Sequence, residues 1–195
     1  MKSKLVVTMA FIFLFASCWA FATTTSVVGS FTDPNDVLIQ EIDLSVTSNV
    51  VLQDFGYSGG TNANGQSFPG TGFFPIMSLF QGTGDSAVFL GNNADDWNTI
   101  HTSVAFSMLA AGDYTFALSN WPNYPIAWNY GSGTLGDGFI NLAAGFYDPY
   151  TYADRDASYA VDITYQGGPV TALEPSALLL LGCGFWGVFG IIRRR

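Results

Sequence analysis

The feature that most constrains the fold is an alternation of apolar and polar residues that recurs along the middle of the chain. Between residues 38 and 47, four apolar residues share one parity and four acidic or hydroxyl residues hold the other: Leu38, Ile42, Leu44 and Val46, and Glu41, Asp43, Ser45 and Thr47. Successive side chains of a strand point to opposite faces, so this pattern predicts a half-buried antiparallel strand. No segment between residues 23 and 165 keeps a 3.6-residue period. We therefore expect an all-β domain.

Further strands are expected wherever short apolar runs alternate with turn residues. These runs cover residues 50–52, 75–80, 87–90, 104–108, 114–118 and 159–165. The Gly-containing segments 82–85 and 111–113 each separate two runs, and each predicts a β-hairpin. Residues 58–65 are rich in Gly and Asn and predict a loop, while 23–36 predicts a lead-in without a strand. The expectation is a single antiparallel β-sandwich over residues 23–165.

The N-terminal segment predicts export. Lys2 and Lys4 precede an apolar run, and Ala20-Phe21-Ala22 supplies small residues for cleavage. We expect residues 1–22 to form a signal peptide with a short apolar helix, cut after Ala22. An alternative is that Cys18 ends a lipoprotein box and becomes lipidated.

The C-terminal segment predicts a membrane-spanning helix after a short linker at 166–172. Residues 176–192 carry no charge, and Arg193, Arg194 and Arg195 follow directly. Seventeen helical residues span roughly 25 Å, the short end of what crosses a bilayer. The arginines are expected to remain in the cytoplasm, because clustered positive charge resists translocation.

This tail resembles the PEP-CTERM sorting signal of Gram-negative bacteria. The resemblance rests on Glu174 and Pro175, a glycine-rich apolar helix and the terminal arginines; Leu173 stands where that signal usually has a first proline. It implies that an exosortase removes the tail at 173–195 and passes the protein to the surface. The alternative is a plain single-pass anchor.

The body also resembles a set of PEP-CTERM surface proteins. Their domain is similar to the bacterial pre-peptidase C-terminal β-sandwich, a jelly-roll-like accessory module. The blocks that carry this resemblance lie at residues 36–44, 57–65, 74–80, 109–115 and 159–163. The resemblance implies a secreted, non-catalytic domain associated with exopolysaccharide or biofilm.

Charge limits the partners of the exported domain. Between Thr23 and Leu173 there are fourteen carboxylates and one cation, Arg155, so the formal charge is −13. Such a surface repels phosphate backbones, which excludes nucleic acid as a partner. Both cysteines, Cys18 and Cys183, fall in the apolar ends, so the domain is expected to fold without a disulfide.

Catalysis is not expected. His101 is the single histidine, and no Gly-x-Ser-x-Gly motif accompanies it. A Ser-His-Asp triad needs a base, and one isolated histidine is more often an ordinary strand-end residue. Zinc is equally disfavoured, with one histidine and no thiol in the domain. A hydrolase that uses His101 is the weakest of the functional hypotheses.

Calcium is the one cofactor that the composition allows. Two clusters of oxygen ligands are candidates, formed by Asp33, Asn35 and Asp36, and by Asn93, Asp95 and Asp96. Calcium binds carboxylate and amide oxygens, but neither cluster has the EF-hand spacing. The alternative is that both are solvated turns, with no cofactor.

A long connection between residues 120 and 155 is the last candidate site. It carries Trp121, Tyr124, Trp128 and Tyr130 among Gly, Asn, Asp and Pro residues. Loops of this length are uncommon unless they carry function, and flat aromatic faces beside amides and carboxylates suit sugar rings. The alternatives are glycan contact and simple covering of the sandwich.

Together these patterns predict an exported surface or matrix protein of a Gram-negative bacterium. Its expected partners are the inner membrane before processing, an exosortase during processing, and extracellular polysaccharide afterwards. A glycan-binding module that uses the aromatic connection is the alternative function.

Overall fold

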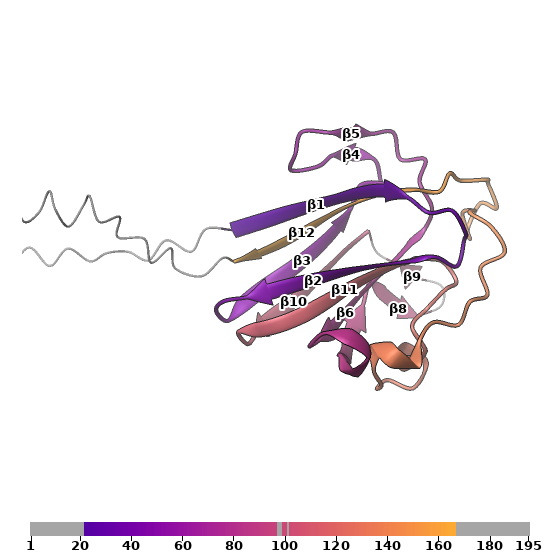
Figure 1. Ribbon diagram of the computed structural model, residues 1–195. Helices are drawn as coiled ribbons and strands as arrows, with labels where there is room; N and C mark the ends of the chain where they lie inside the picture. The colour runs from indigo at the N-terminus through magenta and orange to yellow at the C-terminus, as the bar shows by residue number, and fades with distance from the viewer. Residues whose placement is uncertain (1–21, 97–98, 101, 167–195) are drawn as a thin grey trace, which may run out of the picture. The chain divides into compact units, whose positions relative to one another are not determined.

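Two four-stranded antiparallel sheets face each other in the structure, a computed structural model that describes residues 22–96, 99–100 and 102–166 (Figure 1). Sheet A has the order β1 (Ala22–Ser30), β12 (Ser158–Gln166), β3 (Ser48–Asp54) and β10 (Ser103–Leu109). Sheet B has the order β2 (Val37–Leu44), β11 (Gly112–Asn120), β6 (Pro75–Gln81) and β7 (Val88–Asn92). The all-β, antiparallel prediction is confirmed.

Short elements fill the connections between these strands. Two small hairpins are β4 (Gly60–Thr61) with β5 (Ser67–Phe68), and β8 (Ala94–Asp96) with β9 (Thr99–Ile100). Single turns of helix are η1 (Gly84–Ser86), α1 (Ile126–Asn129) and η2 (Leu135–Asp137). Strand β4 lies within residues 58–65, which the sequence predicted as a loop, and β5 follows that segment.

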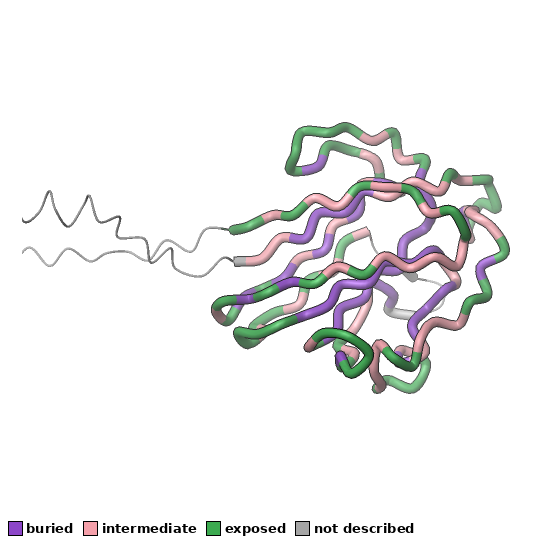
Figure 2. The backbone as a smooth tube through the Cα atoms, in the orientation of Figure 1, coloured by how far each residue is buried: buried purple, intermediate pink, exposed green. Residues whose placement is uncertain are grey.

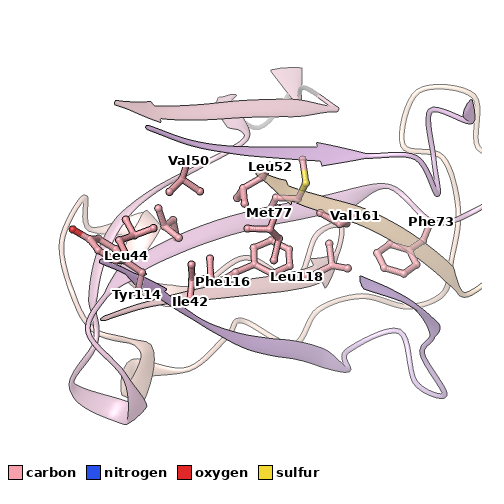
Figure 3. Packing of buried hydrophobic residues seen from close by; sticks show 12 residues of the cluster. Ile42, Leu44, Val50, Leu52, Phe73, Met77, Tyr114, Phe116, Leu118 and Val161 are labelled. Atoms are coloured by element: carbon pink, nitrogen blue, oxygen red, sulfur yellow. The ribbon is translucent and has the colours of Figure 1, made fainter. Parts of the chain in front are cut away.

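The core lies between the two sheets, where alternate residues of each strand meet (Figure 3). Tyr114, Phe116 and Leu118 of β11 are almost fully buried against residues of sheet A such as Leu52 and Ile163. Full burial of one such side chain contributes about 1.5–3 kcal/mol. Burial of the alternate apolar side chains of these strands is therefore the main source of the domain's stability.

The central strands of sheet B, β11 and β6, are buried on their second face as well, whereas Ile39, Glu41 and Asp43 of the edge strand β2 are exposed (Figure 2). Ala117 lies between the core-facing residues of β11 and is 1% exposed, packed with Phe80 and Ala87. Leu135 and Phe139, from the long connection, pack against this cluster. The connection therefore forms a partial third layer over sheet B.

Two predictions about strands were wrong. The runs at 104–108 and 114–118 do not form a hairpin, because β10 pairs with β3 in sheet A whereas β11 pairs with β2 and β6 in sheet B. The turn between the runs instead carries the chain from one sheet to the other. The lead-in at 23–36 contains β1, a Thr-rich strand with little apolar alternation; threonine nevertheless favours strands because it is β-branched.

The chain enters and leaves the sandwich at one end, since Ala22 at the start of β1 pairs with Gln166 at the end of β12. We call this the entry end (Figure 1). The opposite end, the loop end, gathers residues 31–36, 55–74, 121–125 and 141–157.

The predicted signal helix, except for Ala22, and the predicted transmembrane helix at 176–192 lie outside the described residues. None of the helices within the described ranges is long and apolar enough to span a membrane.

Gly72 supports a close approach of three backbone segments at the loop end. Its N–H donates to Gly56 O at 3.0 Å, and a Cβ at this position would lie 2.9 Å from the Gly56 carbonyl carbon and closer still to Ser158 O. We expect Gly72→Ala to lower the free energy of unfolding by about 3 kcal/mol, because backbone atoms must move. Gly145→Ala, where a Cβ meets nothing within 4 Å, is the control. Equal urea midpoints for the two variants would contradict this.

Candidate functional site

The first half of the long connection acts as a cover for sheet B. Tyr124 is 0% exposed and stacks on Trp128, with ring centroids 4.5 Å apart. Both rings, together with Trp121, pack against a small cluster around Ile76. The covering role therefore accounts for these three aromatic residues.

The four predicted glycan-contact residues consequently differ in access. Tyr124 is interior, and Trp121 and Trp128 are half-buried. Tyr130, which follows α1, is 79% exposed. Of the four, only Tyr130 is mostly exposed to solvent. The sequence grouped these residues together as glycan contacts, but the structure separates Tyr130 from the three that pack against sheet B.

The second half of the connection is organised by Arg155 at the loop end. Its guanidinium Nη2 lies 2.7 Å from Asp148 Oδ2, and its Nη1 donates to Gly70 O at 2.7 Å. The guanidinium carbon lies 4.5 Å from the centre of the Tyr57 ring, a cation–π contact. The Tyr57 hydroxyl in turn donates to Asp148 Oδ2 at 2.9 Å.

The pKa shifts of Asp148 and Tyr57 agree with the hydrogen bonds that the two residues make in this cluster. Burial alone would raise the pKa of Asp148, but hydrogen bonds from Arg155, the backbone N–H groups of Tyr150 and Thr151, and Tyr57 hold it well below its usual range. Burial and the Asp148 carboxylate raise the pKa of Tyr57 to about 12. Asp148 is therefore ionised and Tyr57 protonated at neutral pH, so the hydrogen bond between them keeps its direction.

Asp54 holds the turn that carries Tyr57. Its carboxylate, 1% exposed, accepts the backbone N–H groups of Gly56, Tyr57 and Ser58 at 3.0–3.1 Å. Burial outweighs these donors and raises the pKa of Asp54 to about 6. This makes Asp54 an acid that titrates inside the folded domain at mildly acidic pH.

Two exposed tyrosines, Tyr150 and Tyr152, are positioned by contacts with the Arg155 cluster and with Phe74. Tyr150, 53% exposed, contacts Phe74 edge to face at 5.4 Å, and Phe74 contacts Tyr57 in the same way at 4.7 Å. Tyr152 is 80% exposed, has a φ of +57°, and its N–H donates to Asp148 O at 2.8 Å. The Arg155 cluster thus fixes the backbone from which both rings project.

A shallow hollow at the loop end is lined by Thr71, Ala153, Asp154, Arg155 and Asp156. Asp156 Oδ2 accepts the Thr71 hydroxyl at 2.6 Å. The hollow offers carboxylates and a guanidinium that is already paired, and the part of the chain that the structure describes contains neither imidazole nor thiol. Carboxylates such as these can accept hydrogen bonds from hydroxyl-rich ligands.

Asparagine side chains tie the neighbouring loops together. Asn35 pairs through both amide atoms with the backbone of Ala143, at 2.9 and 3.0 Å. The Asn123 amide donates to Asn35 O and accepts the Asn141 N–H. Sequence reasoning missed these ties and the Arg155 cluster; the one signal was that Arg155 is the sole cation of the domain.

The first calcium candidate is occupied by internal contacts. Asp36 Oδ2 accepts three hydrogen bonds, from the Thr32 N–H and hydroxyl and from the Asp33 N–H. Asp33 Oδ1 accepts the Asn35 N–H, and the Asn35 amide is bound to Ala143. This turn therefore closes on itself with hydrogen bonds.

In the second candidate, Asn93 is 2% exposed and bridges Met77 N and Pro75 O, while Asp95 and Asp96 belong to β8, and their side chains lie outside what the structure describes. No cluster of three or more His, Cys, Asp or Glu side chains that could hold a metal is found within residues 22–96, 99–100 and 102–166. Calcium binding stays a prediction.

The remaining predicted site residues lie outside the described ranges. They are Ala20, His101, Glu174, Pro175 and the arginines Arg193, Arg194 and Arg195. Ala22, the residue before the predicted cleavage, is the first residue of β1.

The raised pKa of Asp54 predicts that the stability of the domain depends on pH. Its folded pKa of about 6 lies above the unfolded value of about 3.9, so its contribution to stability is full below pH 4 and is lost as pH rises through 6. We expect the free energy of unfolding to fall by about 2–3 kcal/mol across this window. Asp54→Asn should remove the slope, whatever its effect on the absolute stability. Urea unfolding at pH 4.5 and 7 measures both; an unchanged slope in the variant would assign it to another group.

No protein-family model matches the chain, and no curated protein matches it. Among solved structures, the chain is similar to PliG of Aeromonas hydrophila, a periplasmic lysozyme inhibitor of g-type lysozyme. The two are 12% identical with a TM-score of 0.39, and the match covers 74% of this chain and 88% of that chain. A likeness at this level carries no argument about this chain's function.

Proposed function

We propose that this chain is an exported, non-catalytic surface protein that an exosortase sorts through its C-terminal tail at residues 173–195. After transient anchoring in the inner membrane, it reaches the cell surface or extracellular matrix of a Gram-negative bacterium. There it associates with exopolysaccharide.

The observation that supports this proposal is the pairing of β1 with β12, which after the predicted cleavage begins with Thr23 opposite Tyr165. A cleavage after Ala22 and a linker at 166–172 would both adjoin the entry end. The loops with the exposed tyrosines lie at the opposite end of a rigid sandwich. Loops placed on a rigid scaffold are the usual position of binding residues. A domain held by its entry end is therefore free to present its loop end to its surroundings.

The absence of catalysis is proposed on the composition of the domain. His101 is its one imidazole, and both cysteines lie in the apolar ends. Arg155, the one cation between residues 23 and 173, is engaged with Asp148, Gly70 and Tyr57. Arg155 therefore serves the architecture of the loop end, and the sequence has no Gly-x-Ser-x-Gly motif to accompany His101.

Glycan binding is the second candidate function, and the exposed tyrosines favour it. Tyr150 and Tyr152 present exposed rings in the same loop segment as Asp154 and Asp156, whose carboxylates can accept hydrogen bonds from sugar hydroxyls. The proposed contact surface thus moves from Trp121, Tyr124 and Trp128 toward these residues. Because the domain carries a charge of −13, a neutral polysaccharide fits better than an anionic one.

Sorting is tested by restoring or breaking the motif in the full chain, expressed in its own host. Leu173→Pro should increase the processed fraction and Pro175→Ala should decrease it, with Thr171→Pro as a control for a proline outside the motif. Intact mass of the surface-released form measures processing. We expect this form to lack Arg193, Arg194 and Arg195; if it keeps them, the chain is a plain single-pass anchored protein.

Glycan contact and covering are separated by comparing exposed with packed rings. Tyr152→Ala should weaken binding to the host's extracellular polysaccharide and shift stability by less than about 0.5 kcal/mol, because the ring is exposed. Trp128→Ala should cost about 2 kcal/mol, because its ring stacks on Tyr124, and should leave binding unchanged. Tyr130→Ala shows whether the exposed member of the predicted set takes part. Unaltered binding in both tyrosine variants would rule out this surface.

A further inference from the structure

Four strands form the edges of the two sheets, and edge strands expose backbone groups that can pair with another chain. The edge at β7 is covered by the long connection. The Phe89 N–H donates to Gly133 O at 3.0 Å, and the Leu135 N–H donates to Ala87 O at 2.8 Å. Thr134 forms an isolated bridge with Val88. This edge is therefore occupied from within the chain.

Two further edges carry features that discourage pairing. Strand β10 is interrupted by an irregular register between Phe106 and Leu109, where Met108 has a φ of +56°. Strand β2 presents the exposed carboxylates of Glu41 and Asp43. Bulges and charges are the means by which natural sheets block association at their edges.

Strand β1 has none of these features. Its nine residues, Ala22–Ser30, of which the predicted cleavage removes only Ala22, contain no charge and no proline. They pair with β12 in an unbroken register from Ala22 to Ser30, without a bulge. Within the described ranges, no strand pairs with the other side of β1. The edge is thus regular and, at about 30 Å, long enough for a stable pairing.

We propose that β1 is the surface through which two copies of this chain associate, by antiparallel pairing of β1 with β1 of the second copy. A two-fold axis perpendicular to the strands relates the copies and joins the two A sheets into one continuous sheet. About half of the backbone groups of a strand point to each side, so the pairing forms roughly eight inter-chain hydrogen bonds. A two-fold axis is the commonest symmetry of soluble homodimers.

Charge identifies the partner as a second copy. A cationic partner would favour the acidic edge at β2, with Glu41 and Asp43, over the neutral edge at β1. A second copy carries the same charge of −13 over residues 23–173 and is repelled wherever carboxylates meet. The uncharged edge is where two acidic copies can approach most closely. Val28, 43% exposed on β1, adds an apolar contact there.

The remaining repulsion gives the association a characteristic salt dependence. Glu41 and Asp43 line a small hollow together with Thr25 of β1, so these carboxylates lie beside the proposed interface. Pairing brings the same groups of both copies closer. Added salt screens their repulsion, since the Debye length falls to about 8 Å at 0.15 M. Dimerisation is therefore expected to strengthen with salt.

The first test is sedimentation of the full-length chain in detergent over a range of concentrations and salt. We expect a monomer–dimer equilibrium that Val28→Asp weakens by about tenfold. Val88→Asp, which adds the same charge at a residue 51% exposed on β7, should change it by less than about twofold. A monomer at all concentrations overturns the proposal, and so does an equal response to both variants. The second outcome would mean that net charge or the apolar ends control association.

The second test fixes the register by disulfide cross-linking in a background of Cys18→Ser and Cys183→Ser. Antiparallel pairing predicts that single cysteines at Thr24, Ser26 and Val28 cross-link strongly with themselves at one position at most. When two different single-cysteine variants are mixed, only those pairs should cross-link whose two residue numbers add up to one fixed value, because opposite residues of antiparallel strands have a constant sum. Cross-linking of every position with itself would show parallel pairing. Cross-linking at Ser107 of β10 in place of β1 would place the contact at another edge; either result contradicts the proposal. The test does not depend on how the chain is sorted or whether it binds glycan.

Discussion

Burial of β11 on both faces is the constraint on which the rest of this structure depends. One face, with Tyr114, Phe116 and Leu118, packs against sheet A and forms the core. The other face, which includes Ala117, is closed by the long connection through Leu135 and Phe139. A strand buried on both sides requires a second sheet and a cover. The length of the connection, its aromatic content and its path over sheet B follow from that requirement.

The loop end is held by polar contacts, in contrast to the apolar core. One guanidinium, Arg155, joins Asp148, Gly70 and Tyr57, and the buried Asp54 shapes the turn that carries Tyr57. A paired charge fixes geometry at close range but contributes little net stability, because desolvation offsets the attraction. The loop end is therefore ordered by specific contacts rather than by bulk burial. Such contacts fit the proposed glycan-binding role, in which Tyr150 and Tyr152 are held exposed in one arrangement.

The proposed roles fall on three different regions of the sandwich: the entry end, the loop end and the β1 edge. The entry end joins the segments that the sequence assigns to export and sorting, because Ala22 and Gln166 are paired neighbours. The loop end offers aromatic rings and carboxylates to a ligand. Among the described strands, the outer edge of β1 has no partner and is proposed to pair with a second copy, while β7 is covered, β10 is bulged and β2 is charged. These roles use different surfaces, so binding at one leaves the others accessible.

The amino-acid sequence by itself determined the strand class, the β6–β7 hairpin, the apolar ends and the acidic charge, because each depends on residues close together in the chain. Tertiary structure alone decided that β10 and β11 belong to different sheets and that Thr-rich β1 completes sheet A. It also decided that Tyr124 is interior while Tyr130 is exposed, and that Arg155 meets Tyr57. The physical reason is that alternation shows which face of a strand is buried but not which distant strand covers it. Partners far apart in the chain are selected by the packing and hydrogen bonding of the whole domain.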